Sequence, residues 1–422
     1  MLKLLLILVL GTVATYDSFL SFAHATLIHA GKIVDPLTGA VSHQQKIRIE
    51  GQKITAIGPD LARIDDEEFI NLSYLTILPG LFDAHTHLCA CTRMAAESLG
   101  LDVLDMVLLD PPAYRALQGA VHAREMLEAG FTTVRDLGNS GKYIDVALKR
   151  AIDEGLIDGP TILPAGRILS PFGGQFRAHV DKNILYNDEY LIADSRDDLR
   201  LAIRENIYYG SALIKILVDP RSYSYSREDI QFIVDEAQKS GLKVAAHCQT
   251  EDGARKAALA GVASIEHGWH LSEDILTTMK QKKISLVSTD FTVKTLKAFG
   301  WSEEAAIRKH AEKVKRLKTA FNYGINIAFG SDIMIRVPDE TRGSLAIEYL
   351  ASFVEAGIPN QSILKIFTSN AAQLLGVESE RGLLRVGFYA DLIGVAENPL
   401  EDINTLKDVL FVMKNGKIIM AK

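Results

Sequence analysis

The chain has few cysteines, little excess charge and no long apolar run beyond its first residues. Its 422 residues include three cysteines, which excludes a fold held together by disulfide bonds. The 46 basic and 53 acidic side chains leave a net charge of -7, so the charge balance does not indicate a nucleic-acid partner. No later stretch approaches the ~18 apolar residues of a membrane-spanning helix, so we expect no membrane-embedded body. Short repeats and low-complexity segments are also lacking, and 48% hydrophobic residues suffice for a large core.

The first residues have the pattern of an export signal. Lys3 provides a positive start, residues 4–14 are uncharged and mostly apolar, and residues 23–25 are Ala-His-Ala, which signal peptidase accepts. The apolar stretch is too short to span a bilayer of about 30 Å as a helix. A strand or helix packed on the domain is the alternative, and Asp17 places the cleavage site farther away than usual. We predict an exported protein, periplasmic or secreted, whose mature chain begins at Thr26.

Both ends of the mature chain are rich in short strands. Residues 46–50 and 53–57 alternate between apolar and polar side chains near the amino terminus. Residues 390–395 and 408–412 are apolar strands near the carboxyl terminus, and Asn-Gly at residues 415–416 is typical of a hairpin turn. Two β-rich ends around a long middle predict one discontinuous β domain that both termini build.

The middle of the chain alternates short apolar strands with helical stretches. Such strands favour a parallel sheet covered by helices. Eight candidates lie at residues 78–87, 132–136, 161–165, 213–218, 244–247, 264–267, 285–288 and 327–331. Helical periodicity connects them, for example at residues 120–129, 229–240, 253–260 and 302–322. Eight units predict an α/β fold with a closed (β/α)₈ TIM barrel, whose reactive groups lie at the carboxyl ends of the strands.

Four histidines and one aspartate lie at the ends of these predicted strands. His85 and His87 occupy positions i and i+2, so both imidazoles face the barrel mouth. His247 and His267 end two consecutive strands, and Asp332 follows the eighth strand, which closes the barrel beside the first. Each residue alone is more often a satisfied core residue, and His-x-His is a weak signal. Five residues in equivalent positions favour a site for divalent metal ions.

Lys215 stands inside the apolar strand at residues 212–218. Burial of an ammonium is costly and favours the neutral amine. A neutral amine can add carbon dioxide and become a carbamate, whose two oxygens could bridge two metal ions of a hydrolytic site. An ion pair with a buried carboxylate such as Asp136 is the alternative.

The three cysteines each lie near one of these histidines. Thiolates are plausible zinc ligands. Cys248, however, directly follows His247, and neighbouring strand residues face opposite sides, so we interpret it as core packing. A disulfide between Cys91 and Cys248 is an alternative in an oxidising compartment.

Residues 78–87, Leu-Pro-Gly-Leu-Phe-Asp-Ala-His-Thr-His, resemble the first barrel strand of the metal-dependent amidohydrolase superfamily. Both β-rich ends are similar to that superfamily's small β-sandwich, so the resemblance covers nearly the whole mature chain. After the predicted signal peptide at 1–25, it implies a β-sandwich at 26–78 and 373–422 and a metal-dependent hydrolase barrel at 79–372.

The resemblance also implies a binuclear metal centre. His85 and His87 would bind one divalent ion, His247 and His267 the other, and carboxylated Lys215 would bridge them. Asp332 would bind the first ion and move protons during catalysis. Zinc is the first choice for such nitrogen-rich ligands, although manganese, cobalt or nickel would also be accepted.

Within the superfamily, the sequence most resembles the prolidase-like group. The resemblance lies in Lys215, which stands between two isoleucines, in His247 and in residues 265–268. This group contains Xaa-Pro, Xaa-Arg and Xaa-Lys dipeptidases and imidazolonepropionase-related proteins, with ochratoxin-type amidases nearby. The sequence departs from it at Gln175, where the dipeptidases have the histidine of a Gly-Gly-His, and at residues 219–225, which replace a glycine-rich turn. These departures leave the substrate open.

The expected reaction is hydrolysis of a C–N bond in a dipeptide or an N-acyl amino acid, as in a dipeptidase, carboxypeptidase or amidase. Water between two cations would supply hydroxide near neutral pH, and Asp332 would pass its proton to the leaving nitrogen. Hydrolysis of a cyclic amide or lactone, as in imidazolonepropionase, is one alternative. A metal-binding relative without turnover is the other, and a homo-oligomer is left open.

A substrate with a terminal carboxylate would need donors that face it. Arg177 could bind it in bidentate fashion. Four further residues could assist, and each could equally be a solvated loop residue: Gln175, His179, Tyr223 and Tyr225.

Overall fold

The structure is a computed structural model that describes residues 25–92, 103–175, 189–219 and 223–422. The predicted signal peptide up to residue 24, Arg177 and His179 lie outside the described residues. Among the helices that are described, none has the length and hydrophobicity needed to cross a bilayer.

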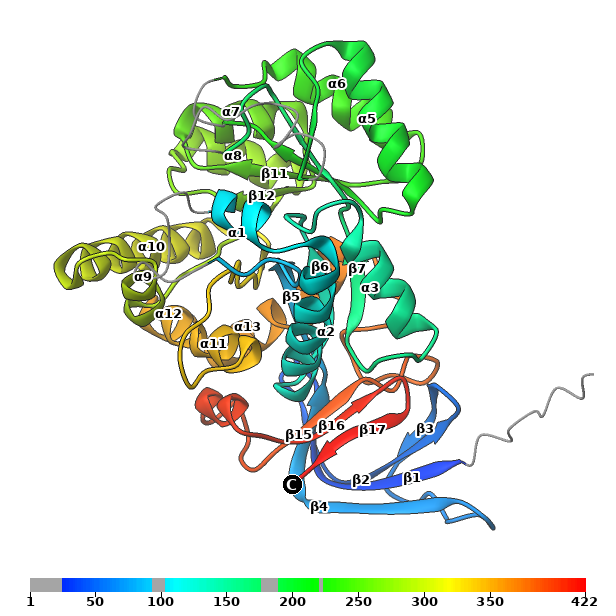
Figure 1. The fold of residues 1–422 in the computed structure, drawn as a ribbon. Coiled ribbons are helices and arrows are strands. Elements are labelled where there is room, and N and C mark those ends of the chain that lie inside the picture. The colour runs from blue at the N-terminus through cyan, green and yellow to red at the C-terminus, as the bar shows by residue number, and fades with distance from the viewer. Residues whose placement is uncertain (1–24, 93–102, 176–188, 220–222) are drawn as a thin grey trace, which may run out of the picture.

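Strands from both ends of the chain form one seven-stranded sheet, drawn in blue and red at the bottom of Figure 1. Its order is β17-β16-β15-β4-β1-β2-β3, and β15 runs antiparallel to β4. The strands are β1 (Thr26–Val34), β2 (Val41–Glu50), β3 (Lys53–Gly58), β4 (Glu68–Pro79), β15 (Leu392–Val395), β16 (Val409–Lys414) and β17 (Lys417–Ala421). The prediction of a discontinuous β unit from both termini is confirmed.

The predicted Asn-Gly turn joins β16 to β17. Asn415 has φ 49° and Gly416 has φ 76°, and Lys414 pairs with Lys417 across the turn. Two positive φ values are typical of a tight hairpin turn whose twist matches that of the strands. The hairpin prediction is therefore confirmed.

The middle of the chain forms the parallel barrel strands. One sheet holds β5 (Leu81–Thr86), β6 (Phe131–Asp136) and β7 (Thr161–Pro164). The other holds β8 (Ile168–Ser170), β9 (Tyr190–Ile192), β10 (Ile214–Leu217), β11 (Val244–Cys248), β12 (Ser264–His267), β13 (Ser285–Val287) and β14 (Ile327–Ala328). Each of the eight predicted ranges overlaps one of these strands. The short strand β8 directly follows β7 in the chain.

Backbone hydrogen bonds join these two sheets into a ring. The amide of Ala84 donates to the carbonyl of Phe329 at 2.7 Å, which links β5 to the end of β14. On the other side, the amide of Ala212 donates to the carbonyl of Pro164 at 2.7 Å. The predicted TIM barrel is confirmed, and its first and last strands are neighbours.

Helices follow the strands and cover the barrel (Figure 1). They are α1 (Val103–Leu109), α2 (Pro112–Glu128), α3 (Ile144–Asp153), α5 (Arg196–Tyr209), α6 (Arg227–Gln238), α7 (Glu251–Ala260), α8 (Glu273–Lys282), α9 (Val293–Ala298), α10 (Glu303–Tyr323), α11 (Arg342–Glu348), α12 (Leu350–Glu355), α13 (Asn360–Ile366), α14 (Ser369–Leu375) and the 3₁₀ helix η1 (Ile403–Lys407). The long helix α10 begins after Ser302, whose hydroxyl accepts from the amide of Ala305, and ends at Gly324 with φ 75°. Both are common signals at helix termini.

The first barrel strand leaves the terminal sheet through Gly80. A Cβ atom at this position would lie 2.1 Å from Oγ1 of Thr132 in β6, so only glycine fits here. The step from β4 to β5 therefore brings β5 directly against β6, and this packing positions the His-x-His segment at the end of β5.

Candidate metal centre

Asp332 lies in contact with three of the predicted metal-site histidines. Its Oδ1 is 3.4 Å from Nε2 of His85 and 3.2 Å from Nε2 of His87. Its Oδ2 is 3.5 Å from Nδ1 of His267. The ligand atoms of His85, His87 and Asp332 all lie within 4.8 Å of one another, a geometry that could hold a metal ion. Residues from the first and last barrel strands thus meet at one point.

The hydrogen bonds of His85 and His87 determine which ring nitrogen carries the proton. Nδ1 of His85 is 2.7 Å from a carboxylate oxygen of Glu266, and Nδ1 of His87 is 2.7 Å from the carbonyl of Gly138. Both partners only accept, so each Nδ1 donates and each Nε2 keeps its lone pair. Both lone pairs are available on the side of Asp332, as metal ligation requires.

His247 and His267 form a second pair. Nε2 of His267 is 2.8 Å from Nδ1 of His247, and Nδ1 of His267 is 2.9 Å from the hydroxyl of Thr289. Two nitrogens that bind one tetrahedral zinc ion at ~2.0–2.1 Å each lie roughly 3.3 Å apart. The two rings therefore need to separate by only a few tenths of an ångström to share an ion.

The backbone at this site has an unusual conformation. His267 has φ 65°, Thr289 has φ 46° and Asp332 has φ 54°, in the left-handed region that non-glycine residues rarely adopt. Such residues tend to cluster at functional sites, where the surrounding structure maintains them.

Burial favours the neutral imidazoles of His85, His247 and His267. It lowers the pKa of His247 to about 3 and that of His85 and His267 well below the usual range. Burial opposes the ionised form of Asp332, but its interactions with His85, His87 and Lys215 outweigh this effect and hold the pKa of this carboxyl below its usual value. Neutral imidazoles and an ionised carboxylate are the protonation states that a divalent cation binds.

Lys215 is buried in β10. Burial lowers its pKa to about 8, while the charges of Glu266 and Asp332 oppose this shift. Asp136, the alternative partner, instead accepts hydrogen bonds from the hydroxyls of Thr86 and Ser140 and from the amide of Leu88. The structure therefore brings Lys215 near the carboxylates of the site rather than into a pair with Asp136.

Sequence analysis missed Glu266 and Arg135, which support His85. Glu266 is fully buried, and its second carboxylate oxygen accepts from Nη2 of Arg135 at 2.8 Å. The guanidinium of Arg135 also donates to the carbonyl of Ala84 at 2.6 Å and to the hydroxyl of Ser264 at 3.1 Å. The signal in the sequence that could identify them is a charged residue inside a predicted strand, as for Lys215.

Asp83 connects the first barrel strand to the last. Its Oδ1 accepts from the amides of His85 and Ser331, both at 3.0 Å. Burial raises its pKa to about 7. Asp83 therefore holds the backbone of His85 next to the segment that carries Asp332.

Of the predicted substrate-binding residues that the structure describes, Gln175 lies closest to the metal centre. Its amide nitrogen is 3.3 Å from Nε2 of His247. Tyr225 is buried, and its hydroxyl donates to the carbonyl of Ala193 at 3.0 Å. This hydrogen bond connects two loops. Tyr223 is exposed and is not among the described residues that line the cavity beside Asp332.

A cavity of about 920 Å³ opens beside Asp332. Aromatic side chains from the loops after β12 and β13 line it, together with α10 residues: Trp269, Phe291, Phe299, Trp301, Lys309 and Lys313. A volume of this size is typical of small-molecule sites. The lining combines these aromatic side chains with charged and polar ones.

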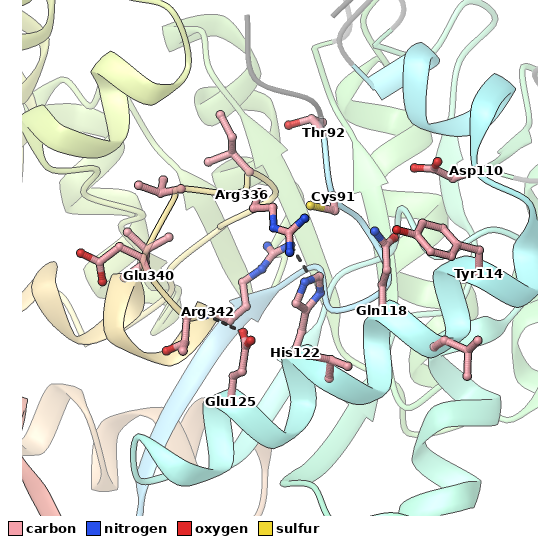
Figure 2. A pocket seen from close by; sticks show the side chains of 16 residues that line it. Cys91, Thr92, Asp110, Tyr114, Gln118, His122, Glu125, Arg336, Glu340 and Arg342 are labelled. Carbon is pink, nitrogen blue, oxygen red and sulfur yellow. Dashed lines mark hydrogen bonds between the residues drawn. The ribbon is translucent and has the colours of Figure 1, made fainter. Parts of the chain in front are cut away.

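A second cavity of about 450 Å³ lies on the other side of Thr92 (Figure 2). Figure 2 shows Arg342 and His122 side by side at its base. Arg342 donates to the carbonyls of Ile333 and Ala90, and Nδ1 of His122 donates to the carbonyl of Leu88 at 2.7 Å. These groups hold loops of the barrel together, which gives His122 a structural role.

All three cysteines are described, and none forms a disulfide. Cys248 is fully buried in the main apolar cluster, so its interpretation as core packing is confirmed. The alternative bond between Cys91 and Cys248 is not formed.

Comparison with known proteins shows the family of this chain. The sequence profile of the amidohydrolase family matches residues 76–419. The chain is 28% identical to ochratoxinase of Aspergillus niger, in an alignment that covers 94% of this chain and 87% of the ochratoxinase. It is 26% identical to imidazolonepropionase of Paracoccus denitrificans, with 87% of this chain and 92% of that protein covered.

Among solved structures, a Xaa-Pro dipeptidase with methionine bound in its active site has a TM-score of 0.81 to this chain at 27% identity. The match covers 93% of this chain and 99% of the dipeptidase. The region that matches the family profile extends from β4 to β17 and includes all six predicted metal-site residues.

Proposed function

Because the chain belongs to the amidohydrolase family, a family of metal-dependent hydrolases, we propose that it hydrolyses the C–N bond of a dipeptide or an N-acyl amino acid. The observation that carries this proposal is the contact of Asp332 with His85 and His87, whose lone pairs face the same carboxylate oxygen. The similarity to a Xaa-Pro dipeptidase and to ochratoxinase supports a substrate of the peptide or amide class.

The residues of the site fit two divalent ions, with zinc as the preferred metal. His85, His87 and Asp332 would hold one ion, His247 and His267 the second, and a carbamate on Lys215 would bridge them. When bound, such ions polarise a substrate carbonyl and lower the pKa of water. The neutral state of the buried imidazoles supports this assignment.

Asp332 is the proposed proton shuttle. Its carboxylate would accept the proton of the attacking water and deliver it to the leaving nitrogen, because an amine leaves poorly unless it is protonated. Glu266 would orient His85 through its hydrogen bond to Nδ1, and Arg135 would hold Glu266 in place.

The test combines metal analysis with a screen of N-acyl amino acids and of Xaa-Pro, Xaa-Arg and Xaa-Lys dipeptides. We expect Asp332→Asn to lower kcat by at least ~10³-fold while most of the metal stays bound, since the amide cannot take up the proton. Asp339→Asn is the matched control, because Asp339 is an exposed aspartate with φ 61° in a nearby loop. Activity of Asp332→Asn close to that of the wild type would refute the assigned role.

The carbamate on Lys215 has its own test. Metal loading in buffer freed of carbon dioxide should yield protein with reduced metal content, and added bicarbonate should restore it. Lys215→Arg cannot form the carbamate and should not respond to bicarbonate. Full metal loading without bicarbonate would argue for an unmodified lysine.

Hydrolysis of a cyclic amide or lactone is the second candidate, since imidazolonepropionase is among the similar proteins. Mass spectrometry separates the two reactions. A dipeptide or N-acyl amino acid gives two products, whereas ring opening adds one water molecule and gives one.

We also propose that residues 1–25 direct export. Protein recovered from the producing cells should then begin at Thr26, as measured by intact mass. An intact mass that includes the first 25 residues would contradict this.

A further inference from the structure

Lys313 is a buried cation that the proposed reaction does not use. It lies on α10 with 8% of its surface exposed, and among the described residues its ammonium has no hydrogen-bond partner. An ammonium has three donors and no acceptor, and burying it without acceptors is unfavourable. Burial lowers its pKa to about 7, the nearby Arg316 adds to this shift, and Asp290 and Asp332 oppose it.

The ammonium of Lys313 stands between two aromatic faces. Nζ is 4.8 Å from the ring centre of Trp269 and 5.0 Å from that of Phe291. Cation–π contacts of this kind stabilise the charge in part but do not satisfy N–H donors. The side chain is therefore held in place while its donors stay available.

Lys313 and Asp332 line the same cavity of about 920 Å³. Of the other cations that line it, Arg316 uses both terminal nitrogens for the carbonyls of His267 and Ser288 and the carboxylate of Asp290. Lys309 is only partly buried, with Nζ 4.2 Å from the ring centre of Trp301, and Lys315 is exposed. Lys313 is thus the buried lining cation whose donors lack partners among the described residues.

Part of the aromatic lining of the cavity is exposed to solvent. Trp269 is 38% exposed and Trp301 is 44% exposed, although both line the cavity. Glu251 and Glu312, which also line it, are exposed to solvent. The interior therefore offers an aromatic surface and, in Lys313, a buried cation whose donors have no partner among the described residues.

We propose that Lys313 binds a carboxylate of the substrate while the apolar part of the same molecule packs against Trp269 and Phe291. This inference rests on the proposed hydrolysis of dipeptides or N-acyl amino acids and narrows the substrate to carboxylates with a bulky apolar or aromatic group. It assigns to Lys313 the role that sequence analysis gave to Arg177. A bound carboxylate would satisfy the ammonium donors with charge-assisted hydrogen bonds.

Tryptophan fluorescence should report whether this cavity is occupied. The chain has two tryptophans, Trp269 and Trp301, and both line the cavity. Hydrocinnamate and hydrocinnamyl alcohol are suitable probes, because they share the phenylpropyl group and differ in the carboxylate. Neither contains a bond that the enzyme could hydrolyse. Titration of each probe into the full-length, zinc-loaded protein gives the preference for acid over alcohol.

Lys313→Met removes the charge and keeps a long apolar side chain. We expect it to weaken hydrocinnamate binding by about tenfold or more and to change alcohol binding by less than about twofold. Lys313→Arg should retain most of the preference for the acid. Lys309→Met is the matched control, since it removes the same charge from the same helix one turn away, and it should leave the preference unchanged.

Three outcomes would overturn the proposal. The first is an unchanged acid preference in Lys313→Met. The second is equal loss of acid and alcohol binding, which would mean that Lys313 supports the cavity wall. The third is an acid preference that a chelator abolishes and Lys313→Met does not, because the metal ions would then bind the carboxylate.

These titrations measure binding without turnover, so they separate this inference from the proposed function. If no C–N bond is hydrolysed but the acid preference depends on Lys313, the anion site stands and the proposed reaction fails. If hydrolysis is found but the preference does not depend on Lys313, only the anion site fails.

Discussion

At the scale of single residues, the candidate metal centre depends on hydrogen bonds that orient each imidazole. Glu266 and the carbonyl of Gly138 each accept a hydrogen bond from one Nδ1–H, which leaves Nε2 of His85 and His87 for a ligand. His-x-His spacing predicts that both rings face one side, but it does not identify these acceptors. Glu266 is 181 residues away from His85 in the chain and meets it only across the barrel.

His122 allows a prediction about acid stability. Burial in α2 lowers its pKa from 6.5 to about 3, so the folded protein keeps it neutral. In the unfolded chain it takes up a proton near pH 6.5. Between about pH 6.5 and about pH 3 the unfolded state therefore binds one more proton, and this residue lowers the free energy of unfolding by about 1.4 kcal/mol for each unit that the pH falls.

The variant His122→Asn tests this dependence, because its amide nitrogen can still donate to the carbonyl of Leu88. Urea unfolding should be measured for both proteins at about pH 7.5 and about pH 5. The variant should lose about 2 kcal/mol less stability than the wild type over this interval. Parallel losses in the two proteins would show that His122 does not carry the effect.

At the scale of elements, the site depends on how closely β14 approaches β5. Gly330 follows β14, and a Cβ atom there would lie 2.4 Å from Cγ1 of Val287 and 2.7 Å from Cβ of His85. Its φ is not positive, so an L-residue would not strain the backbone there. Steric contact alone explains the need for glycine.

Gly330→Ala should therefore push the segment that carries Asp332 away from His85. We expect a loss of about 1–3 kcal/mol in the free energy of unfolding, together with weaker metal binding. Gly58→Ala is the control, because no atom lies within 4 Å of a Cβ at that position in β3. Denaturant unfolding and metal titration measure both effects. A Gly330→Ala protein with wild-type metal affinity would contradict this account of the strand contact.

At the scale of the whole molecule, the terminal sheet and the barrel share one core. Ile393 and Val409 from the terminal sheet belong to the same buried cluster as Met126 and Leu127 of α2. Figure 1 shows α2 against β16 and β17, the strands at the end of the chain. Because the apolar surface is continuous, separating the two parts would expose it to water.

We expect the metal-loaded protein to unfold in a single calorimetric transition. Val409→Ala, which removes buried methyl groups from the terminal sheet, should cost about 2 kcal/mol and lower that one melting temperature. Metal release, followed with a chromophoric chelator, should move to the same lower temperature. Two separate transitions, with metal release following only the second, would show that the sheet and the barrel unfold independently.

Local pattern was sufficient for the eight barrel strands, the Asn-Gly hairpin and the residues placed at strand ends, because side-chain periodicity and turn chemistry act over a few neighbouring residues. The arrangement around the site required the folded chain. Glu266 and Arg135, the contact of β14 with β5, and the buried Lys313 beside Trp269 all arise from residues distant in sequence. Their positions depend on barrel closure and helix packing, which pattern over adjacent residues does not specify.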